Sequence, residues 1–419
     1  MNKTNRYLLP FILVTSLFFL WAFLHNTNPI LIPHLKKACR LSDTQSAFID
    51  TAVYLAYFSI ALPAGWFMHK YGYKKGIIFG LLLYGLGALL FLPAASSLNY
   101  LFFLLALFII ASGATFLETV ANPYITRLGD EQTAAQRLNF AQSFNGVGAF
   151  IAPIIGGRLI LSGVEHSPDE LKQMEISGTL NAYLQSEADT VRIPYLVIAV
   201  LVFILVVLFF ITKLPEGETN ASEDEGHAFS FRVFRHRHVT WAVIAQFFYV
   251  GAQVCVGSFF IRFSKFVMDM PEKEAAYKWG SIAMVGFMVG RFTGTLLMKY
   301  IRADRLLGLY ALINMVLLTT AISTRGSIAV YSLMAVPFFM SIMFPTIFAL
   351  GIKGLGEETK IASSFIVMSI VGGALFPLLS GRISDATGGN IQWGYVVPLI
   401  CFAVVALYAW KASPIKQTN

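Results

Sequence analysis

The chain has 419 residues, of which 56% are hydrophobic and only 13% are charged. Soluble globular domains carry about 25% charged residues, so this composition excludes a soluble globular protein and predicts a polytopic membrane protein. The net charge of +8 does not indicate a nucleic-acid partner, because Lys and Arg flank apolar runs. Cys39, Cys255 and Cys401 are odd in number and far apart, which predicts neither a disulfide framework nor a metal site.

Apolar runs of about 20 residues, the length that crosses a bilayer, predict an all-α protein with twelve membrane spans. The expected spans are 7–34, 46–69, 76–95, 99–126, 135–162, 192–213, 237–267, 273–300, 304–323, 326–350, 358–385 and 391–411. We therefore expect residues 1–213 and 239–419 to form two six-helix bundles, joined by a polar cytoplasmic linker at 214–238.

The distribution of Lys and Arg predicts the orientation of these spans. Segments 69–75 and 299–305 are basic, whereas the polar segment 163–191 is mainly acidic. The positive-inside rule then places both termini in the cytoplasm. Two six-helix halves with a central cytoplasmic linker favour the major facilitator architecture, whose binding site lies between the halves near the bilayer midplane.

The fourth predicted span contains the sequence FLETVANPYITRLG, with Glu118 well inside it. A carboxylate at a helix centre costs about 2.5–3.5 kcal/mol on insertion scales, so acids there usually face a cavity or pathway. Asn122 follows one turn later on the same helix face. The structural alternative is that Glu118 only forms an ion pair with Arg127 or Arg291.

In the fifth span, Asn139, Gln142 and Asn145 recur every three residues and form a polar stripe. Each amide offers a donor and an acceptor, which suits the hydroxyl groups of a sugar. Hydrogen bonding between helices is the alternative, and for Gln142 the two interpretations are equally weighted.

The seventh span places Gln246, Tyr249 and Gln253 on one face. The Tyr249 ring could contact the C–H face of a sugar, although an aromatic residue at this spacing more often packs in the core. In the eighth span, Arg291 lies between glycines and is expected either to pair with a buried carboxylate or to form a gating contact. We expect Pro345 in the tenth span to mark a hinge, because proline frees a backbone carbonyl.

The first span ends in the sequence FLHNTNPILIPHL, which is unusually polar for a membrane segment. Pro29 and Pro33 each remove a backbone donor, which is tolerated where the freed groups line a cavity. We therefore expect His25, Asn26 and Asn28 to face that cavity.

Several segments together resemble a known family. They are LFFLWAF, ALPAGWFMHKYGYKKGIIFGLLLYGLGALLF, FLETVANPY, RLNFAQSFN, AQFFYVGAQ, GRFTGT, FPTIFALGIKGLG and SSFIVMSIVGG. Across nearly the whole chain they resemble the fucose, glucose and galactose permeases of the major facilitator superfamily. The resemblance implies proton-driven sugar uptake across a bacterial inner membrane by a carrier without a cofactor, which we expect to be monomeric. L-Fucose is the expected substrate. A hexose carrier of the same family, which could be a uniporter, is the alternative.

The resemblance also implies residue roles. Glu118 is expected to gate proton and sugar binding, and Gln142 and Asn145 match the family's amide segment. His69 stands where the general facilitator pattern has an aspartate, so that gating ion pair is absent or altered here. Lys70, the next residue, is assigned to the same gate.

The main departure from the family lies at Asn28-Pro29, where relatives carry Asn-Asp. Proline cannot titrate, so the family's proton-coupling acid is missing at this position. Asp50 stands where the family usually has glutamine. Our hypothesis is that Asp50 supplies the displaced carboxylate, or that His25 joins Glu118 in handling the proton. Alternatively, Asp50 is solvated at the outer mouth or caps the second span.

Other function classes lack support in the sequence. An ATP-driven pump would need a phosphate-binding glycine loop, and none is evident. An intramembrane enzyme would need clustered catalytic residues inside the spans, and the sequence has none. A sugar sensor would need a signalling extension, whereas the predicted spans leave only a few residues at either end.

Overall fold

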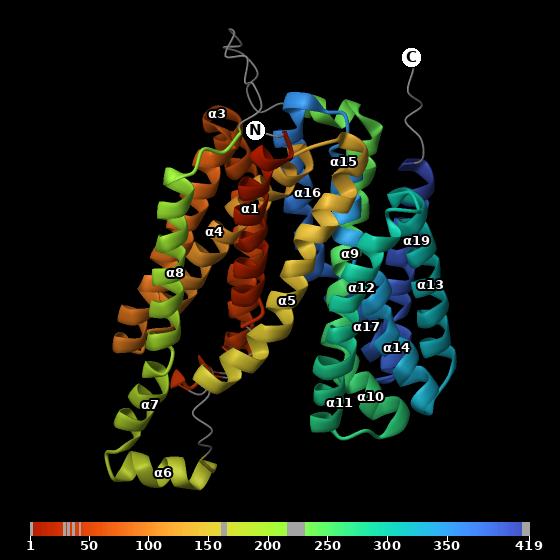
Figure 1. The fold of residues 1–419 in the computed structure, drawn as a ribbon. Helices are drawn as coiled ribbons and strands as arrows, with labels where there is room; N and C mark the ends of the chain where they lie inside the picture. The colour runs from red at the N-terminus through yellow and green to blue at the C-terminus, as the bar shows by residue number, and fades with distance from the viewer. Residues whose placement is uncertain are drawn as a thin grey trace.

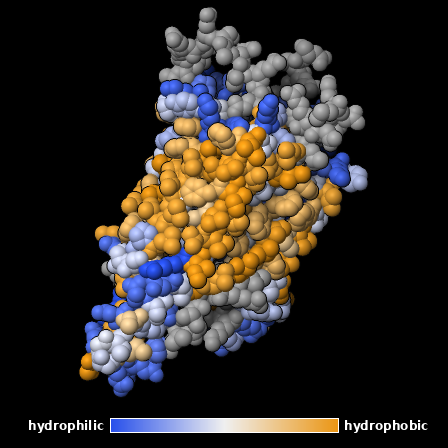
Figure 2. Space-filling model, turned by 60° about the vertical axis from the view of Figure 1, so that its left-hand side comes forward, coloured by the Kyte–Doolittle hydropathy of each residue, from blue (hydrophilic) through white to orange (hydrophobic). Residues whose placement is uncertain are grey.

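The structure, a computed structural model, describes residues 3–27, 31, 34–35, 38–41, 43–160, 166–215 and 231–412. These residues form helices and connecting turns, with no strand among them. Figure 2 shows a broad hydrophobic surface across the middle of the molecule, with hydrophilic residues gathered toward both ends. This pattern is what a bilayer requires of a multi-pass membrane protein.

The first half is built from long helices that pack against one another. At Gly148 the fifth span approaches the first span closely, because a Cβ there would lie 2.6 Å from the Phe19 carbonyl oxygen. Residue Gly72 has φ 84° and ψ 173°, and it breaks one continuous helical stretch into the predicted second and third spans. The spanning helices of this half are α1 (Lys3–His25), α3 (Asp43–Ser97), α4 (Tyr100–Arg127), α5 (Ala134–Ile160) and α8 (Arg192–Ile211).

The polar segment that joins the fifth and sixth spans contains two short helices. They are α6 (Pro168–Ile176) and α7 (Leu180–Asp189). Ser167 and Glu170 form a capping box at the start of α6, which satisfies backbone donors that the first turn leaves free.

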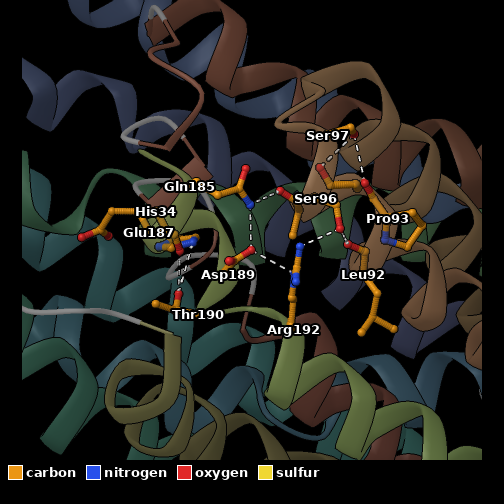
Figure 3. Close-up of polar contacts among 12 residues, drawn as sticks. His34, Leu92, Pro93, Ser96, Ser97, Gln185, Glu187, Asp189, Thr190 and Arg192 are labelled. Carbon is orange, nitrogen blue, oxygen red and sulfur yellow. Dashed lines mark hydrogen bonds and ion pairs between the residues drawn. The ribbon is translucent and has the colours of Figure 1, made fainter. Parts of the chain in front are cut away.

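A polar network attaches α7 to the end of the third span (Figure 3). Arg192 lies 2.9 Å from the carboxylate of Asp189 and donates to the Ser96 hydroxyl at 2.6 Å. Gln185 donates both to Asp189 and to the backbone carbonyl of Ala95. These contacts hold α7 firmly on the end of α3.

The second half has the same number of spans but more interruptions. Its helices are α9 (Arg237–Ser258), α10 (Phe260–Met268), α11 (Glu272–Lys278), α12 (Met284–Leu297), α13 (Ala303–Ser323), α14 (Gly326–Met340), α15 (Met343–Gly351), α16 (Thr359–Met368), α17 (Gly372–Ala386), α18 (Ile391–Gly394) and α19 (Val396–Ala412). A π-helical turn, Trp279–Ala283, connects α11 to α12 within the eighth span.

Two of the interruptions fall near residues that the sequence marks. The tenth span breaks between α14 and α15, shortly before Pro345, which lacks the donor a continuous helix needs. The eleventh span has a 3₁₀ turn at Ser369–Val371, directly before Gly372. At both breaks the helix is already interrupted, so the backbone can change its local geometry there without disrupting regular helical hydrogen bonds.

Nine helical stretches within the described residues are long and apolar enough to cross a membrane. One of them, Thr51–Ser97, contains two spans separated by Gly72, and α1 and α5 supply the remaining two. The predicted fold of twelve transmembrane helices is therefore confirmed. The predicted linker at 214–238 lies largely outside the described residues, which resume at Phe231 with a short 3₁₀ helix.

The two halves meet along α3, α4 and α5 of the first half and α12, α15 and α16 of the second. At one end of the molecule α1 begins and α19 ends, and we call this end the terminal face (Figure 1). At the opposite end α5 diverges from α10 and α11. Gly65 of α3 fits tightly against α16, since a Cβ there would lie 1.6 Å from the Ser364 hydroxyl oxygen.

Candidate functional site

The buried carboxylate of α4 lies in a cluster of polar side chains from several spans. Glu118 is 8% exposed, and the Tyr57 hydroxyl from α3 is a hydrogen-bond partner of its carboxyl group. Asn122, fully buried, donates to the backbone carbonyl of Glu118 at 2.8 Å. Gln142 of α5 in turn donates to the Asn122 side-chain oxygen at 3.1 Å. Hydrogen bonds thus connect Glu118 and Asn122 of the fourth span to Gln142 of the fifth span.

Arg291 of α12 extends this contact into the second half of the molecule. It is 4% exposed, and its guanidinium donates to the backbone and side-chain oxygens of Gln142. It also donates to the Asn145 side chain at 3.1 Å and to the Ser341 carbonyl at 3.0 Å. The Phe287 ring lies 4.6 Å away. Only arginine offers five donors in a planar fork, which suits these partners in different directions.

We call Tyr57, Glu118, Asn122, Gln142, Asn145 and Arg291 the central polar cluster. It contains an acid that can exist in two protonation states, amides that can donate and accept, and a cation that contacts both halves. Electrostatic attraction between Glu118 and Arg291 acts through this cluster, although the described ion pairs include none between them. Arg127, the other candidate partner of Glu118, is engaged at the terminal face instead.

Only some of the predicted site residues of the first two spans lie among the described residues. Asn26 donates to the Ala22 carbonyl at 2.7 Å, which caps the last turn of α1. The described helix ends at His25, earlier than the expected end at residue 34. Asn28 and the side chains of His25 and Asp50 lie outside the described residues.

The three predicted residues of the seventh span have different environments. The Tyr249 hydroxyl donates to the Met340 carbonyl at 3.0 Å, so the phenol is engaged inside the second half. Gln246 is fully buried, and neither atom of its amide has a hydrogen-bond partner among the described residues. Gln253 is half-buried. A buried amide without partners is costly, so Gln246 is the member of this face with the most unused hydrogen-bonding capacity.

A second group of charged residues joins the halves at the terminal face. Glu357, just before α16, lies 3.6 Å from Arg127 of α4 and 3.1 Å from Lys360 of α16. His69 of α3 also acts electrostatically on Glu357. We call these four residues the terminal-face latch. The other residue assigned to the gate, Lys70, packs over the rings of two residues in its own helix.

The structure also shows participants that sequence reasoning missed. Tyr57 lies in the apolar-looking sequence YLAYF, and nothing in that pattern distinguishes it from a packing residue. Ser341 contributes a backbone carbonyl, which no side-chain motif encodes. Glu357 could have been found from GEETK, a charged turn that directly precedes a predicted span.

The described residues give no group of three or more His, Cys, Asp or Glu side chains that could hold a metal ion. Cys39, Cys255 and Cys401 are free thiols. The central polar cluster offers one carboxyl group, amides, a phenol hydroxyl and one guanidinium as hydrogen-bonding groups.

Comparison with known proteins identifies the superfamily to which this chain belongs. Residues 11–370 match the model of the Major Facilitator Superfamily, and the chain belongs to that superfamily. It is 43% identical to the L-fucose-proton symporter of Escherichia coli (strain K12), over 97% of this chain and 94% of the symporter. It is 41% identical to the glucose/galactose transporter of Brucella abortus biovar 1 (strain 9-941), over 96% of this chain and 93% of that transporter.

A solved structure agrees with the fold. The superfamily transporter FucP, crystallised in the outward conformation, matches with a TM-score of 0.90 and 43% sequence identity. The match covers 98% of this chain and all of the FucP chain. The expected fold and family are thus confirmed over nearly the full length of the protein.

Proposed function

We propose that this protein takes up L-fucose together with protons by alternating access, and that it is a transporter rather than an enzyme. The observation that carries the proposal is the central polar cluster, a buried acid joined by amides to a guanidinium from the opposite half. The 43% identity to an L-fucose-proton symporter supports the substrate and the coupling ion.

Glu118 couples the proton to the sugar in this mechanism. Burial disfavours its charged form, so it takes up a proton from outside and then donates as well as accepts hydrogen bonds. The amides of Asn122, Gln142 and Asn145 bind sugar hydroxyl groups beside it. The neutral, loaded carrier reorients, and rehydration of Glu118 on the other side releases the proton. A membrane potential of 100 mV supplies about 2.3 kcal/mol per proton, roughly fifty-fold in accumulation.

The other predicted sugar contacts are assigned by position. Asn26 directly follows α1, and Gln246, Tyr249 and Gln253 follow one face of α9. Asn28, outside the described residues, is assigned from the sequence alone. Of these, Gln246 has the clearest basis, because neither atom of its buried amide has a hydrogen-bond partner among the described residues.

We further infer that the protein lies in the bacterial inner membrane with both termini in the cytoplasm. Basic segments such as 69–75 and 299–305 support this orientation, since they lie at the terminal face. The terminal face is then cytoplasmic and closed, which corresponds to the outward conformation of FucP. The central linker at 214–238 also lies on the cytoplasmic side, between bundles at 1–213 and 239–419.

A glucose or galactose carrier is the second candidate function. The 41% identity to a glucose/galactose transporter is nearly as high as the identity to the fucose symporter. The resemblance implies a titratable residue of the family where this chain has Pro29, and the lack of that residue favours uniport in this alternative. Asp50 or His25 restores the lost acid or base in the coupled mechanism.

The experiment that separates these candidates is the pH change outside de-energised cells when sugar is added. A symporter of L-fucose makes the medium alkaline on addition of L-fucose, and an uncoupler abolishes the signal. Alkalinisation by D-galactose or D-glucose alone would establish the second substrate class. Uptake of labelled sugar without any pH change would establish uniport.

The role of Asp50 has its own test. Asp50→Asn removes the titratable group while keeping a similar shape, and we expect proton-driven accumulation to fall while sugar binding is retained. Unchanged accumulation removes Asp50 from the mechanism and leaves His25 as the candidate partner of Glu118.

A further inference from the structure

The terminal face contains a cavity that the transport mechanism does not use. Its volume is about 840 Å³, within the range of small-molecule sites. Residues 126–136 of the first half form one wall, and residues 298–304 and 349–359 of the second half form the other. Because both halves contribute, the cavity in this form exists only while the terminal face is closed.

The charge of this cavity is positive. Four lysine or arginine residues line it against two carboxylates, those of Glu131 and Asp304. Asp304 is already paired with Arg302 at 2.6 Å. Lys299 and Lys353 are exposed, and the described ion pairs include neither. Their two ammonium groups are therefore available to an anion.

The backbone beside Lys353 adds a second, independent feature. Leu355 has right-handed dihedral angles (φ −89°, ψ −7°), and Gly356 directly after it has a left-handed φ of 53°. Alternation of this kind turns successive N–H groups to one side and forms a concavity that binds anions. The hydrogen bonds described for this loop give no acceptor for the N–H groups of Gly354, Leu355 and Gly356.

We propose that this cavity binds a phosphate group, carried by a phosphorylated sugar or by a lipid headgroup, and that binding holds the terminal face closed. Lys299 and Lys353 supply charge, and the Leu355–Gly356 turn supplies directed donors, a combination that suits a tetrahedral anion. The ligand bridges the halves, so it stabilises the closed form and slows reorientation. That this happens in the cytoplasm rests on the proposed orientation and function.

The first test measures binding directly and does not depend on transport. The purified full-length protein in neutral detergent is heated with inorganic phosphate or glucose 6-phosphate, against potassium chloride at the same ionic strength. Phosphate compounds raise the unfolding midpoint, because a ligand that binds only the folded state stabilises it. In K299Q/K353Q the apparent affinity falls about tenfold or more, since two charge-assisted contacts are lost.

The matched control is K75Q/K213Q, which removes the same charge from exposed lysines of the first half outside the cavity. It keeps the wild-type response. An equal response in K299Q/K353Q, or no response in the wild type, would overturn the proposal, whatever sugar the protein carries.

Nanodiscs distinguish the two sources of phosphate. Phosphatidylcholine discs with added glucose 6-phosphate test the soluble ligand, and discs containing phosphatidylglycerol without it test the lipid. Stabilisation in either case that K299Q/K353Q abolishes supports the site and identifies its ligand. In right-side-out vesicles loaded with the effective ligand, sugar influx slows several-fold in the wild type and is unchanged in K299Q/K353Q. Equal inhibition of both proteins would contradict the bridging role.

Discussion

The central polar cluster and the terminal-face latch both join the halves of the molecule, but they do so in different environments. In the cluster, Glu118 is 8% exposed, Arg291 4% and Asn122 fully buried. In the latch, the side chains of Arg127 and Glu357, which meet across the interface, are 30% and 57% exposed, whereas Lys360, on the same side as Glu357, is 2% exposed. Water screens the Arg127–Glu357 contact of the latch, whereas contacts in the cluster act at low effective dielectric.

Because their exposure differs, the cluster and the latch are suited to different roles. Breaking a buried charged contact costs about 3–5 kcal/mol, because a charge is left without compensation. An exposed ion pair contributes about 0.2–1 kcal/mol. The cluster is therefore suited to make reorientation of the carrier depend on the binding of both the proton and the sugar. The latch is suited to adjust the balance between two conformations that must both be reachable.

The largest effect is expected from Glu118→Gln, which mimics the protonated acid permanently. Sugar exchange at equal concentrations is retained, because the hydrogen-bonding shape of the site is preserved. Uphill accumulation is lost, from roughly fifty-fold per 100 mV to none, since no proton is carried. Counterflow and energised uptake of labelled sugar in proteoliposomes measure the two quantities separately. Loss of exchange as well would show that Glu118 only builds the structure.

The next largest effect is expected from Arg291→Gln. The substitution removes the charge and most of the donors that reach Gln142, Asn145 and Ser341, each worth about 1.5–3 kcal/mol when charged. We expect the initial rate of uptake to fall about 100-fold.

Arg291→Lys is the matched control, because it keeps the charge near Glu118 but not the planar fork. The initial rate of uptake by Arg291→Lys should lie between the rates of the wild type and of Arg291→Gln. If Lys restores the full rate, charge alone matters and the described hydrogen bonds do not.

The third prediction concerns the packing that accompanies the latch. Gly65→Ala places a methyl group 1.6 Å from the Ser364 hydroxyl oxygen and 2.8 Å from the Ser364 Cβ. Overpacking costs about 1–3 kcal/mol and acts only where α3 and α16 meet. The equilibrium should shift toward a form open at the terminal face by about tenfold.

Labelling of a single cysteine introduced in the terminal-face cavity reports this shift. Gly286→Ala serves as the control, because no described atom outside its own stretch of helix lies within 4 Å of a Cβ at that position. Equal labelling of both variants would mean that the Gly65 contact does not limit opening.

The sequence was sufficient for the fold because lipid leaves few alternatives. Apolar runs of span length, with charged residues between them, identify helices directly, and breaks near Pro345 and Gly372 follow from backbone chemistry. The polar segment 163–191 is different, because α6 and α7 depend on contacts such as that between Gln185 and the distant Ala95 carbonyl.

The site was only partly predictable for a related reason. A polar residue in an apolar span stands out, so Glu118, Gln142 and Arg291 could be identified without a structure. Their partners could not, because a backbone carbonyl such as that of Ser341 and a tyrosine such as Tyr57 have no distinctive pattern. His69 was recognised as a departure from the superfamily pattern, but its proximity to Glu357 depends on how two halves dock.

The smallest effect is expected from Glu357→Gln, and it bears most directly on the comparison. The neighbouring Glu358 pairs with His236, near the end of the linker, at 2.6 Å, whereas Glu357 reaches Arg127 across the interface. Both carboxylates are partly exposed. The buried Lys360 pairs with Glu357 inside the second half, so its loss of a partner acts in both conformations, and the opening equilibrium reports the exposed contact with Arg127. Only Glu357→Gln should favour opening of the terminal face, by less than about fivefold, and high salt should reduce its difference from wild type. A larger shift, or an equal one in Glu358→Gln, would mean that the latch is not the weak, adjustable contact its exposure indicates.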